Sequence, residues 1–300
     1  MSFMLPSTES SLPDLTGFDT WDSPRILSLF LAGQCRALDA VERALPAIAD
    51  AAALVASRVG DGGRLFYAGA GTSIRVGVQD GTELPATFGM PEDKLCYLIA
   101  GERAAMFETL ADAEDDAEKG RDVAKACTAK DVLIAIAASG RTPYTLAAAQ
   151  TARENGCAVI AVVNNAGSPL GKAADIEVFI DSGPEVISGS TRMGAGTAQK
   201  ATLNLISSLA FTRLGAVHDG LMVNVLAGNS KLVARAHGIV KKITAATDAQ
   251  VADALQLSNN QIKPAVLLCK GAADLAAAQK LLADTKGNLR LALSKLSTSV

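Results

Sequence analysis

The chain has 300 residues, of which 49% are hydrophobic and 20% are charged, and its formal net charge is −3. A chain of this length and composition forms one large domain, or a domain with a small appendage, around a sizeable core. The charge excludes the basic surface that binding to nucleic acid or to a membrane surface requires.

The first 23 residues are rich in Ser, Pro and Asp, and we predict that residues 1–23 form an extended arm. Their acidic character, together with Pro6 and Pro13, is not that of a signal peptide. No apolar run reaches transmembrane length. The 5 cysteines are scattered and never form a C-x-x-C pair, so we expect free thiols and a soluble cytoplasmic protein.

Apolar residues at helical spacing then predict two helices within residues 25–59, interrupted near Gly33. Beyond them, strands and helices alternate. The predicted strands are 65–68, 96–100, 132–137, 158–163 and 176–180. The predicted helices are 72–79, 104–119, 143–154 and 196–214. This alternation predicts an α/β fold with a doubly wound parallel sheet.

After Asn229 the pattern becomes helical, with short segments separated by Gly, Asn or Pro. Segment 262–269 could be a strand by propensity, although Pro264 is equally natural in the first turn of a helix. We therefore predict three regions. They are the arm 1–23, an α/β domain 24–229 that begins with helices, and a small C-terminal all-helical subdomain 230–300.

Two predicted strands end in loops of small and hydroxyl-bearing residues. The first is Gly69-Ala-Gly-Thr-Ser73, and the second is Ala138-Ser-Gly-Arg-Thr142. Such loops bring backbone N–H groups and hydroxyls to an anion at a helix N-terminus. The first loop lacks both the third glycine of the dinucleotide fingerprint and the lysine of the P-loop. Glycines in one loop could merely turn the chain, but the pair predicts a phosphate-bearing metabolite.

Further motifs accompany these two loops. They are Glu83-Leu-Pro-Ala-Thr-Phe-Gly89, Ala113-Glu-Asp115, Gly183-Pro-Glu-Val-Ile-Ser-Gly-Ser-Thr-Arg-Met193 and Ala195-Gly-Thr-Ala-Gln-Lys200. Together, over about residues 41–296, the motifs resemble the N-acetylmuramic acid 6-phosphate etherases, which have the flavodoxin-like SIS (sugar isomerase) fold. The resemblance implies a lyase that converts N-acetylmuramate 6-phosphate to N-acetylglucosamine 6-phosphate and D-lactate. It also implies a homodimer that uses neither a metal nor an organic cofactor.

The resemblance places the acid and base at Glu83 and Glu114. In the open-chain sugar the lactyl ether at C3 is β to the aldehyde, so removal of the C2 proton permits elimination, and water adds back at C3. By family analogy Glu83 protonates the departing lactate and Glu114 handles the C2 proton, with the reverse assignment open. From the residues alone, Glu114 belongs to a solvated acidic face and Glu83 is an ordinary helix-start carboxylate.

We expect hydroxyls and backbone N–H groups to hold the substrate. The predicted phosphate cradle comprises Thr72, Ser73, Ser139, Gly140, Arg141 and Thr142. Ser139 and Thr142 could at the same time cap the following helix. A third cluster, Ser188, Ser190 and Thr191, could close over the sugar or form a flexible polar turn. The two histidines, His218 and His237, lack partners at ligand spacing, so we expect structural roles and no metal site.

Two positions depart from the family pattern. Ile74 stands where the family usually has glycine, and it could narrow the pocket or shift the helix start. Thr8-Glu9 begins the N-terminal motif Thr-Glu-x-Arg-Asn-Pro, but Ser10, Ser11 and Leu12 follow. Two alternatives therefore stay open: an aldose–ketose phosphosugar isomerase, and a non-enzymatic phosphosugar-sensing regulatory protein.

The spacing of Glu83 from the first loop raises a further question. A continuous helix would carry Glu83 roughly 15 Å beyond Ser73, which is too far for one hexose phosphate to span comfortably. Either the helix stops near Gly81 and the chain doubles back, or Glu83 reaches the neighbouring subunit's pocket.

Overall fold

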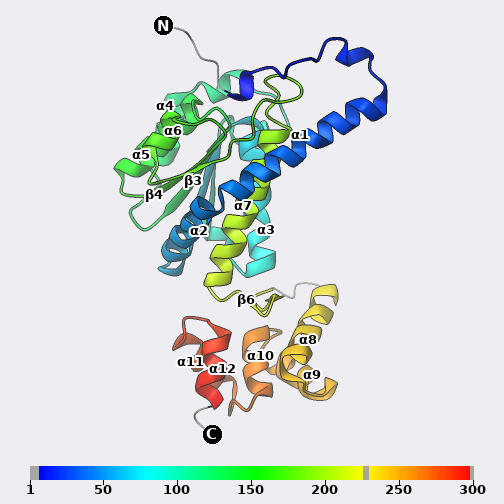
Figure 1. Cartoon of the computed structure of the whole chain (residues 1–300). Coiled ribbons are helices and arrows are strands. Elements are labelled where there is room, and N and C mark those ends of the chain that lie inside the picture. Colours follow the sequence, from blue (N-terminus) through cyan, green and yellow to red (C-terminus); the bar gives the residue numbers. More distant parts are fainter. Residues whose placement is uncertain (1–6, 226–229, 298–300) are drawn as a thin grey trace. The chain divides into compact units, whose positions relative to one another are not determined.

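The computed structural model describes residues 7–225 and 230–297. It contains a parallel sheet with the strand order β2-β1-β3-β4-β5 (Figure 1). The strands are β1 (Leu65–Gly69), β2 (Leu95–Ile99), β3 (Val132–Ala137), β4 (Ala158–Val163) and β5 (Ile176–Phe179). The predicted doubly wound parallel sheet is confirmed, and its order is the flavodoxin-like one.

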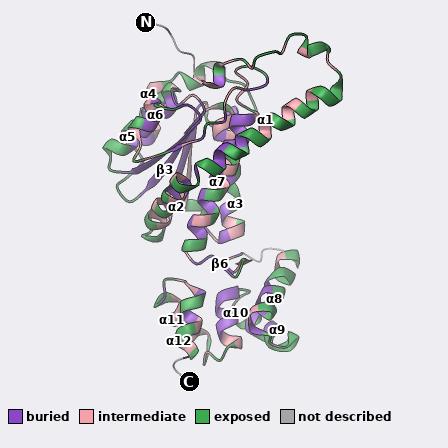
Figure 2. Ribbon diagram, in the orientation of Figure 1, coloured by how far each residue is buried: buried purple, intermediate pink, exposed green. Residues whose placement is uncertain are grey.

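Helices cover both faces of this sheet (Figure 1). On one face lie α4 (Ala117–Ala124), α5 (Pro143–Glu154) and α6 (Pro169–Ala173). On the other lie α2 (Leu45–Gly60), α3 (Gly71–Phe88) and α7 (Gly194–Arg213). Strands β3 and β4 are buried along their whole length (Figure 2), as continuous apolar runs between two helical layers should be.

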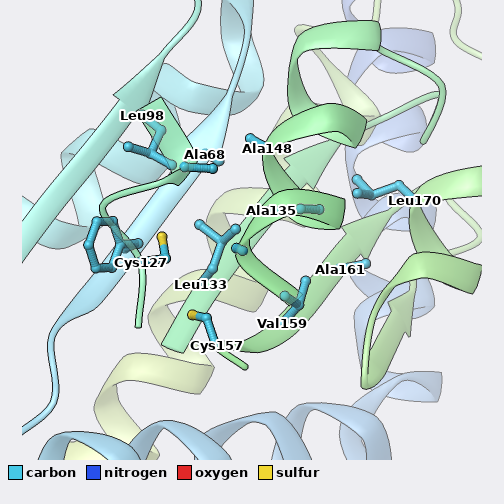
Figure 3. Close-up of a cluster of buried hydrophobic side chains, with 14 of the residues drawn as sticks. Ala68, Leu98, Cys127, Leu133, Ala135, Ala148, Cys157, Val159, Ala161 and Leu170 are labelled. Carbon is cyan, nitrogen blue, oxygen red and sulfur yellow. The ribbon is translucent and has the colours of Figure 1, made fainter. Parts of the chain in front are cut away.

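Alternate strand residues form the core beneath α4, α5 and α6. Figure 3 shows it, with Ala68, Leu133, Ala135, Val159 and Ala161 from the strands, Ala148 from α5, Leu170 from α6, and the thiols of Cys127 and Cys157. Many of these side chains are alanines, which allow a helix to approach the sheet closely. The many alanines of the chain therefore contribute to the close packing of these helices on the strands.

The N-terminal helices divide at a different residue from the predicted one. Helix α1 (Ser23–Arg43) runs without interruption through Gly33, so the predicted break there is wrong. The chain instead breaks at Ala44, and Pro46, which has no backbone N–H to continue the hydrogen bonds of α1, lies in the first turn of α2. Asp22 begins α1 by accepting a hydrogen bond from the backbone N–H of Arg25 at 2.8 Å.

The predicted helix over 104–119 is also wrong. Two 3-10 helices, η4 (Glu102–Met106) and η5 (Ala111–Glu114), precede α4. Asp116 caps α4 by accepting from the backbone N–H of Lys119 at 2.8 Å, which sets the start of that helix after the acidic run. The segment therefore has no continuous helical face on which apolar residues could be buried.

The chain packs as two units. The first comprises Met1–Gly81 and Asp93–Ser207, and the second comprises Thr82–Glu92 and Ser208–Val300. Helices α3 and α7 each contribute residues to both units. The predicted domains 1–23, 24–229 and 230–300 were drawn from changes in the sequence pattern, whereas these two units are defined by contacts in the structure. The three domains therefore stay a prediction.

The second unit contains a short hairpin that the sequence pattern did not indicate, β6 (Val217–His218) with β7 (Leu221–Met222). The predicted helical C-terminal region is confirmed. Its helices are α8 (Ser230–Thr244), α9 (Asp248–Leu257), α10 (Ile262–Cys269), α11 (Leu275–Ala283) and α12 (Leu289–Ser297). Segment 262–269 is thus a helix rather than a strand. No helix of the described residues has both the length and the hydrophobicity needed to cross a membrane.

Candidate active site

The first and second loops lie next to each other at the carboxyl edge of the sheet. Strand β1 is hydrogen-bonded to β3, and Gly69 at the end of β1 pairs with Ile136 near the end of β3. From β1 the chain passes first to β2 on one side and then to β3 on the other. This is the point at which the strand order reverses, and open α/β sheets bind their ligands beyond the strand ends there.

A chain of buried amides holds the hydroxyl of the first loop. Ser73 Oγ donates to Gln199 Oε1 at 3.0 Å, and Gln199 Nε2 donates to Asn164 Oδ1 at 3.0 Å. Asn164 in turn donates to the carbonyl oxygen of Ile180 at 3.2 Å and to Ser182 Oγ at 3.2 Å. Because a serine carries one hydroxyl proton, Ser73 can donate to a phosphate only when it leaves Gln199.

Ile74 follows Ser73 and is fully buried. A Cβ atom at Gly69 would lie 3.3 Å from the Cβ of Ile74, so the isoleucine packs directly beneath the loop. Helix α3 nevertheless begins at Gly71. The β-branched side chain therefore belongs to the interior rather than to the surface of the loop.

The second loop is shaped by Gly140 and Ser139. Gly140 has a φ of +61°, and a Cβ atom there would lie 2.3 Å from Ser168 Oγ, so only glycine fits. Ser139 Oγ accepts from the backbone N–H of Arg141 at 3.1 Å. Thr142 is the N-cap residue of α5, but its side chain makes no capping hydrogen bond. The first turn of α5 thus has no side-chain cap, which suits binding of an anion.

In the third loop, residues 183–193, the buried carboxylate of Glu185 fixes the end that leads into α7. Glu185 accepts from the backbone N–H groups of Gly194 and Ala195, both at 2.9 Å, and so caps the N-terminus of α7. A negative charge at this position is favourable because of the helix dipole. Ser188 Oγ in the same loop donates to the carbonyl oxygen of Glu9 at 3.2 Å. Ser190 and Thr191 are half-buried in this loop.

Glu114 is exposed at the end of η5. The segment that leads to it is held by Arg75 of α3, whose guanidinium donates to the carbonyl oxygens of Ala105 at 2.8 Å and Glu108 at 3.1 Å. Arg75 therefore connects the helix that follows the first loop to the segment that carries Glu114. The catalytic role of Glu114 stays a prediction.

Glu83 is exposed in the second half of α3 and is not a helix-start residue. The alternative in which the helix stops near Gly81 is wrong, since α3 continues to Phe88. Gly81 lies inside this helix at a place with no room for a side chain, since a Cβ atom would lie 2.6 Å from Tyr97 Oη. The catalytic role of Glu83 likewise stays a prediction.

Asp80, three residues before Glu83, is buried and fully hydrogen-bonded. It accepts from Tyr67 Oη at 2.7 Å, from Asn204 Nδ2 at 2.6 Å and from Ser207 Oγ at 3.0 Å. Burial, together with the Asp80 carboxylate, raises the pKa of Tyr67 well above its ordinary value. These bonds attach α3 to β1 and to α7, so the direction of α3 is fixed from two sides.

Comparison with known proteins shows two levels of similarity. Residues 97–208 match the SIS domain family. The whole chain is 41% identical over 290 residues to the N-acetylmuramic acid 6-phosphate etherase of Serratia proteamaculans, covering 96% of this chain and 98% of that one. The chain belongs to the N-acetylmuramic acid 6-phosphate etherase family.

Other members of the etherase family agree. The Streptomyces avermitilis etherase is 41% identical over 290 residues, which is 96% of this chain and 93% of that one. The etherase of Symbiobacterium thermophilum is 49% identical over 229 residues, or 76% of each chain. Among solved structures, a phosphoheptose isomerase from Francisella tularensis has 20% identity and a TM-score of 0.49, covering 63% of this chain and 97% of that one.

Sequence reasoning missed several residues that support these etherase loops. Gln199, Arg75 and Asp80 bond to residues 126, 30 and 127 positions away along the chain, whereas Glu185 caps α7 from only 9 residues before Gly194. Glu185 and Gln199 lie inside the motifs quoted above, which were the only signal for them. The histidines lie outside the loops. His218 is buried beside Asp219, and burial lowers its pKa. No group of three His, Cys, Asp or Glu in the described part of the chain could hold a metal ion.

Proposed function

We propose that this chain cleaves the D-lactyl ether of N-acetylmuramate 6-phosphate, giving N-acetylglucosamine 6-phosphate and D-lactate. The observation that carries the proposal is the pair of hydroxyl loops at the point where the strand order reverses, in a chain that belongs to the etherase family. The loops support the binding of a phosphosugar, and membership of the etherase family supports the reaction.

The phosphate lies, in this proposal, at the uncapped N-terminus of α5. Its negative charge interacts favourably with the helix dipole, and its oxygens accept from first-turn N–H groups. The Thr142 hydroxyl, which makes no capping bond, donates to the same group. Ser139 and Gly140 shape the turn, Arg141 is exposed beside it, and Thr72 and Ser73 complete the phosphate cradle from the first loop.

The ether is broken by elimination followed by hydration. One glutamate, assigned to Glu114, takes the C2 proton, and the electron pair forms a C2–C3 double bond as the C3–oxygen bond breaks. The other, assigned to Glu83, gives its proton to the departing lactate oxygen. Water then adds its oxygen to C3 and gives a proton to Glu83, while Glu114 returns a proton to C2. Each carboxyl group ends in its starting state.

The partner in this proposal is a second copy of the chain. Helix α1 exposes Leu27 by 64%, Leu31 by 65% and Leu38 by 46%, at spacings that place them along one side of the helix.

Since α3 continues past Gly81, we further propose that Glu83 serves the neighbouring subunit's site. Hybrids of Glu83→Gln and Ser139→Ala subunits should regain part of the lost activity. If hybrids form without activity, each site is made by one chain.

We also propose a cytoplasmic location, supported by the 5 free cysteines, and no binding to nucleic acid, supported by the net charge of −3.

The test of the reaction is incubation with N-acetylmuramate 6-phosphate and an assay for D-lactate. Lactate release supports the etherase. Formation of a ketose phosphate would indicate the isomerase instead, and binding without turnover would indicate the regulatory protein.

A further inference from the structure

The beginning of the described chain is packed against residues far along the sequence. Residues 7–11, which we call the N-terminal strap, start with the 3-10 helix η1 (Ser7–Glu9). Thr8 within it is fully buried, although it belongs to a segment rich in serine and proline. A buried hydroxyl is costly unless it is hydrogen-bonded, so the partners of Thr8 indicate what holds the strap.

Asn165 is the hydrogen-bond partner of the Thr8 hydroxyl, and it uses its whole amide group. Its Nδ2 donates to Thr8 Oγ1 at 2.9 Å and to the carbonyl oxygen of Ala138 at 2.9 Å, while its Oδ1 accepts from Ser7 Oγ at 3.0 Å. Ala138 directly precedes Ser139 in the second loop. One side chain thus connects the N-terminal strap to the loop of the phosphate cradle.

The other side of the N-terminal strap contacts the third loop. Ser188 Oγ donates to the carbonyl oxygen of Glu9 at 3.2 Å and accepts from Ser11 Oγ at 3.3 Å. Gly189 lies close to Glu9, since a Cβ atom at Gly189 would be 3.0 Å from Glu9 Oε2. The strap therefore bridges the second and third loops, which are otherwise separated along the chain by β4 and β5.

We propose that the N-terminal strap is part of the substrate site and that Thr8 is a positioning residue. By binding Asn165, Thr8 holds the strap in place, and the strap orders the third loop over the bound sugar phosphate. Substrate then meets a site that is already formed, and affinity increases because less freedom is lost on binding. This inference rests on the proposed function for the identity of the ligand, but the contacts themselves do not depend on it.

The decisive variant is Thr8→Val, which keeps the shape of the side chain and removes the hydroxyl. It leaves one N–H of Asn165 unpaired, so the strap and the third loop loosen together. We expect KM for N-acetylmuramate 6-phosphate to rise about tenfold, with kcat within about twofold of the wild type. Thr8→Ser, which retains the hydroxyl, should restore a KM close to that of the wild type.

A second readout follows the loop directly. Arg192 is exposed in the third loop, so trypsin should cut after it faster in Thr8→Val, and N-acetylglucosamine 6-phosphate should slow that cut. The matched control is Thr20→Val in the same arm, because the Thr20 hydroxyl is exposed and donates to the carbonyl oxygen of Gly17. This control should change neither KM nor cleavage.

Wild-type KM and wild-type cleavage in Thr8→Val would overturn the inference. A loss of thermal stability without a change in KM would also overturn it, since that is the result of a purely structural role. If Thr8→Val fails to fold, Ser11→Ala replaces it: it removes an exposed hydroxyl, and it should still accelerate cleavage after Arg192. If the wild type releases no lactate, the proposed function fails, whereas the ligand-free cleavage rates still decide whether the strap orders the loop.

Discussion

The two edges of the sheet use their polar groups in opposite ways. At the amino edge, Asp131 accepts from the backbone N–H of Arg64 at 2.9 Å and from its guanidinium at 2.8 Å. It also accepts from the backbone N–H and the hydroxyl of Thr128, both at 2.8 Å. Burial raises the pKa of Asp131, but these hydrogen bonds outweigh it and hold the pKa at about 2. The charges of this edge are neutralised within the fold.

At the carboxyl edge the first and second loops carry mainly neutral hydroxyls, with the exposed Arg141 beside them, and the N-terminus of α5 has no side-chain cap. The Ser73 hydroxyl donates to the buried amide of Gln199, which donates to Asn164. The Ser139 hydroxyl accepts from the backbone N–H of Arg141, and the Thr142 side chain makes no capping hydrogen bond. The comparison teaches that one edge uses its polar groups for stability, while the other leaves a helix N-terminus without a side-chain cap, where we propose that an anion binds. Substitutions at the two edges should therefore change different quantities, the free energy of unfolding at one and KM at the other.

The largest effect should come from a residue that belongs to neither edge. Glu83→Gln should lower lactate release by about 10²- to 10⁴-fold, because the departing oxygen loses its acid. Exchange of the C2 proton with solvent should survive, since that step uses the other glutamate. Deuterium incorporation at C2 measures this step beside a lactate assay. If both activities vanish, Glu83 is the base, and if neither changes, it lies outside the site.

At the amino edge, Asp131→Ala should destabilise the fold by about 3–5 kcal/mol, because Arg64 loses its buried partner. KM measured at a temperature where the variant is folded should not change. Denaturant unfolding measures the free energy of unfolding, and initial rates measure KM. The control is Asp122→Ala, which removes an exposed ion pair with Lys125 and should leave stability unaltered. A raised KM in Asp131→Ala would break the separation of the two edges.

The same carboxylate predicts a pH dependence. The pKa of Asp131 is lower in the folded chain than its ordinary value, so its contribution is present above about pH 4 and is lost as pH falls towards 2. A lowering to about 2 corresponds to roughly 2–3 kcal/mol. The difference in unfolding free energy between the wild type and Asp131→Asn should therefore shrink across this window. A difference that stays constant from pH 5 to pH 2 contradicts the assignment.

The smallest effect concerns the second loop. Thr142→Val should raise KM about tenfold, because the phosphate loses a hydroxyl donor. The free energy of unfolding should change by less than about 0.5 kcal/mol. Thr151→Val is the matched control in the same helix, because Thr151 lies in the last turn of α5, away from the N-terminus where the phosphate is proposed to bind. It should leave KM unchanged. Equal KM values for the two variants would remove Thr142 from the phosphate cradle.

What the sequence predicted well was local. The apolar runs that became β3 and β4, and the small residues that end β1 and β3, are dictated by neighbouring residues and by burial on both faces. The order of the strands followed from the etherase resemblance and not from any one segment.

What the sequence could not predict depends on contacts between distant residues. The anchoring of Ser73 by Gln199 needs the folded chain, because the two residues lie 126 positions apart and meet only when the first loop packs on α7. The predicted helix at 104–119 failed in part because Arg75 holds Ala105 from 30 residues away, which no local pattern reveals. The cap that Asp116 gives to Lys119 is by contrast a local contact. The packing of Thr8 was invisible because its partner Asn165 lies 157 residues away.

The central claim is that the carboxyl edge holds the phosphate, and a crystal structure with N-acetylglucosamine 6-phosphate tests it most directly. The account predicts a phosphate within hydrogen-bond distance of the Ser139 and Thr142 hydroxyls and of the first-turn N–H groups of α5. A phosphate bound elsewhere, with the first and second loops empty, would contradict it.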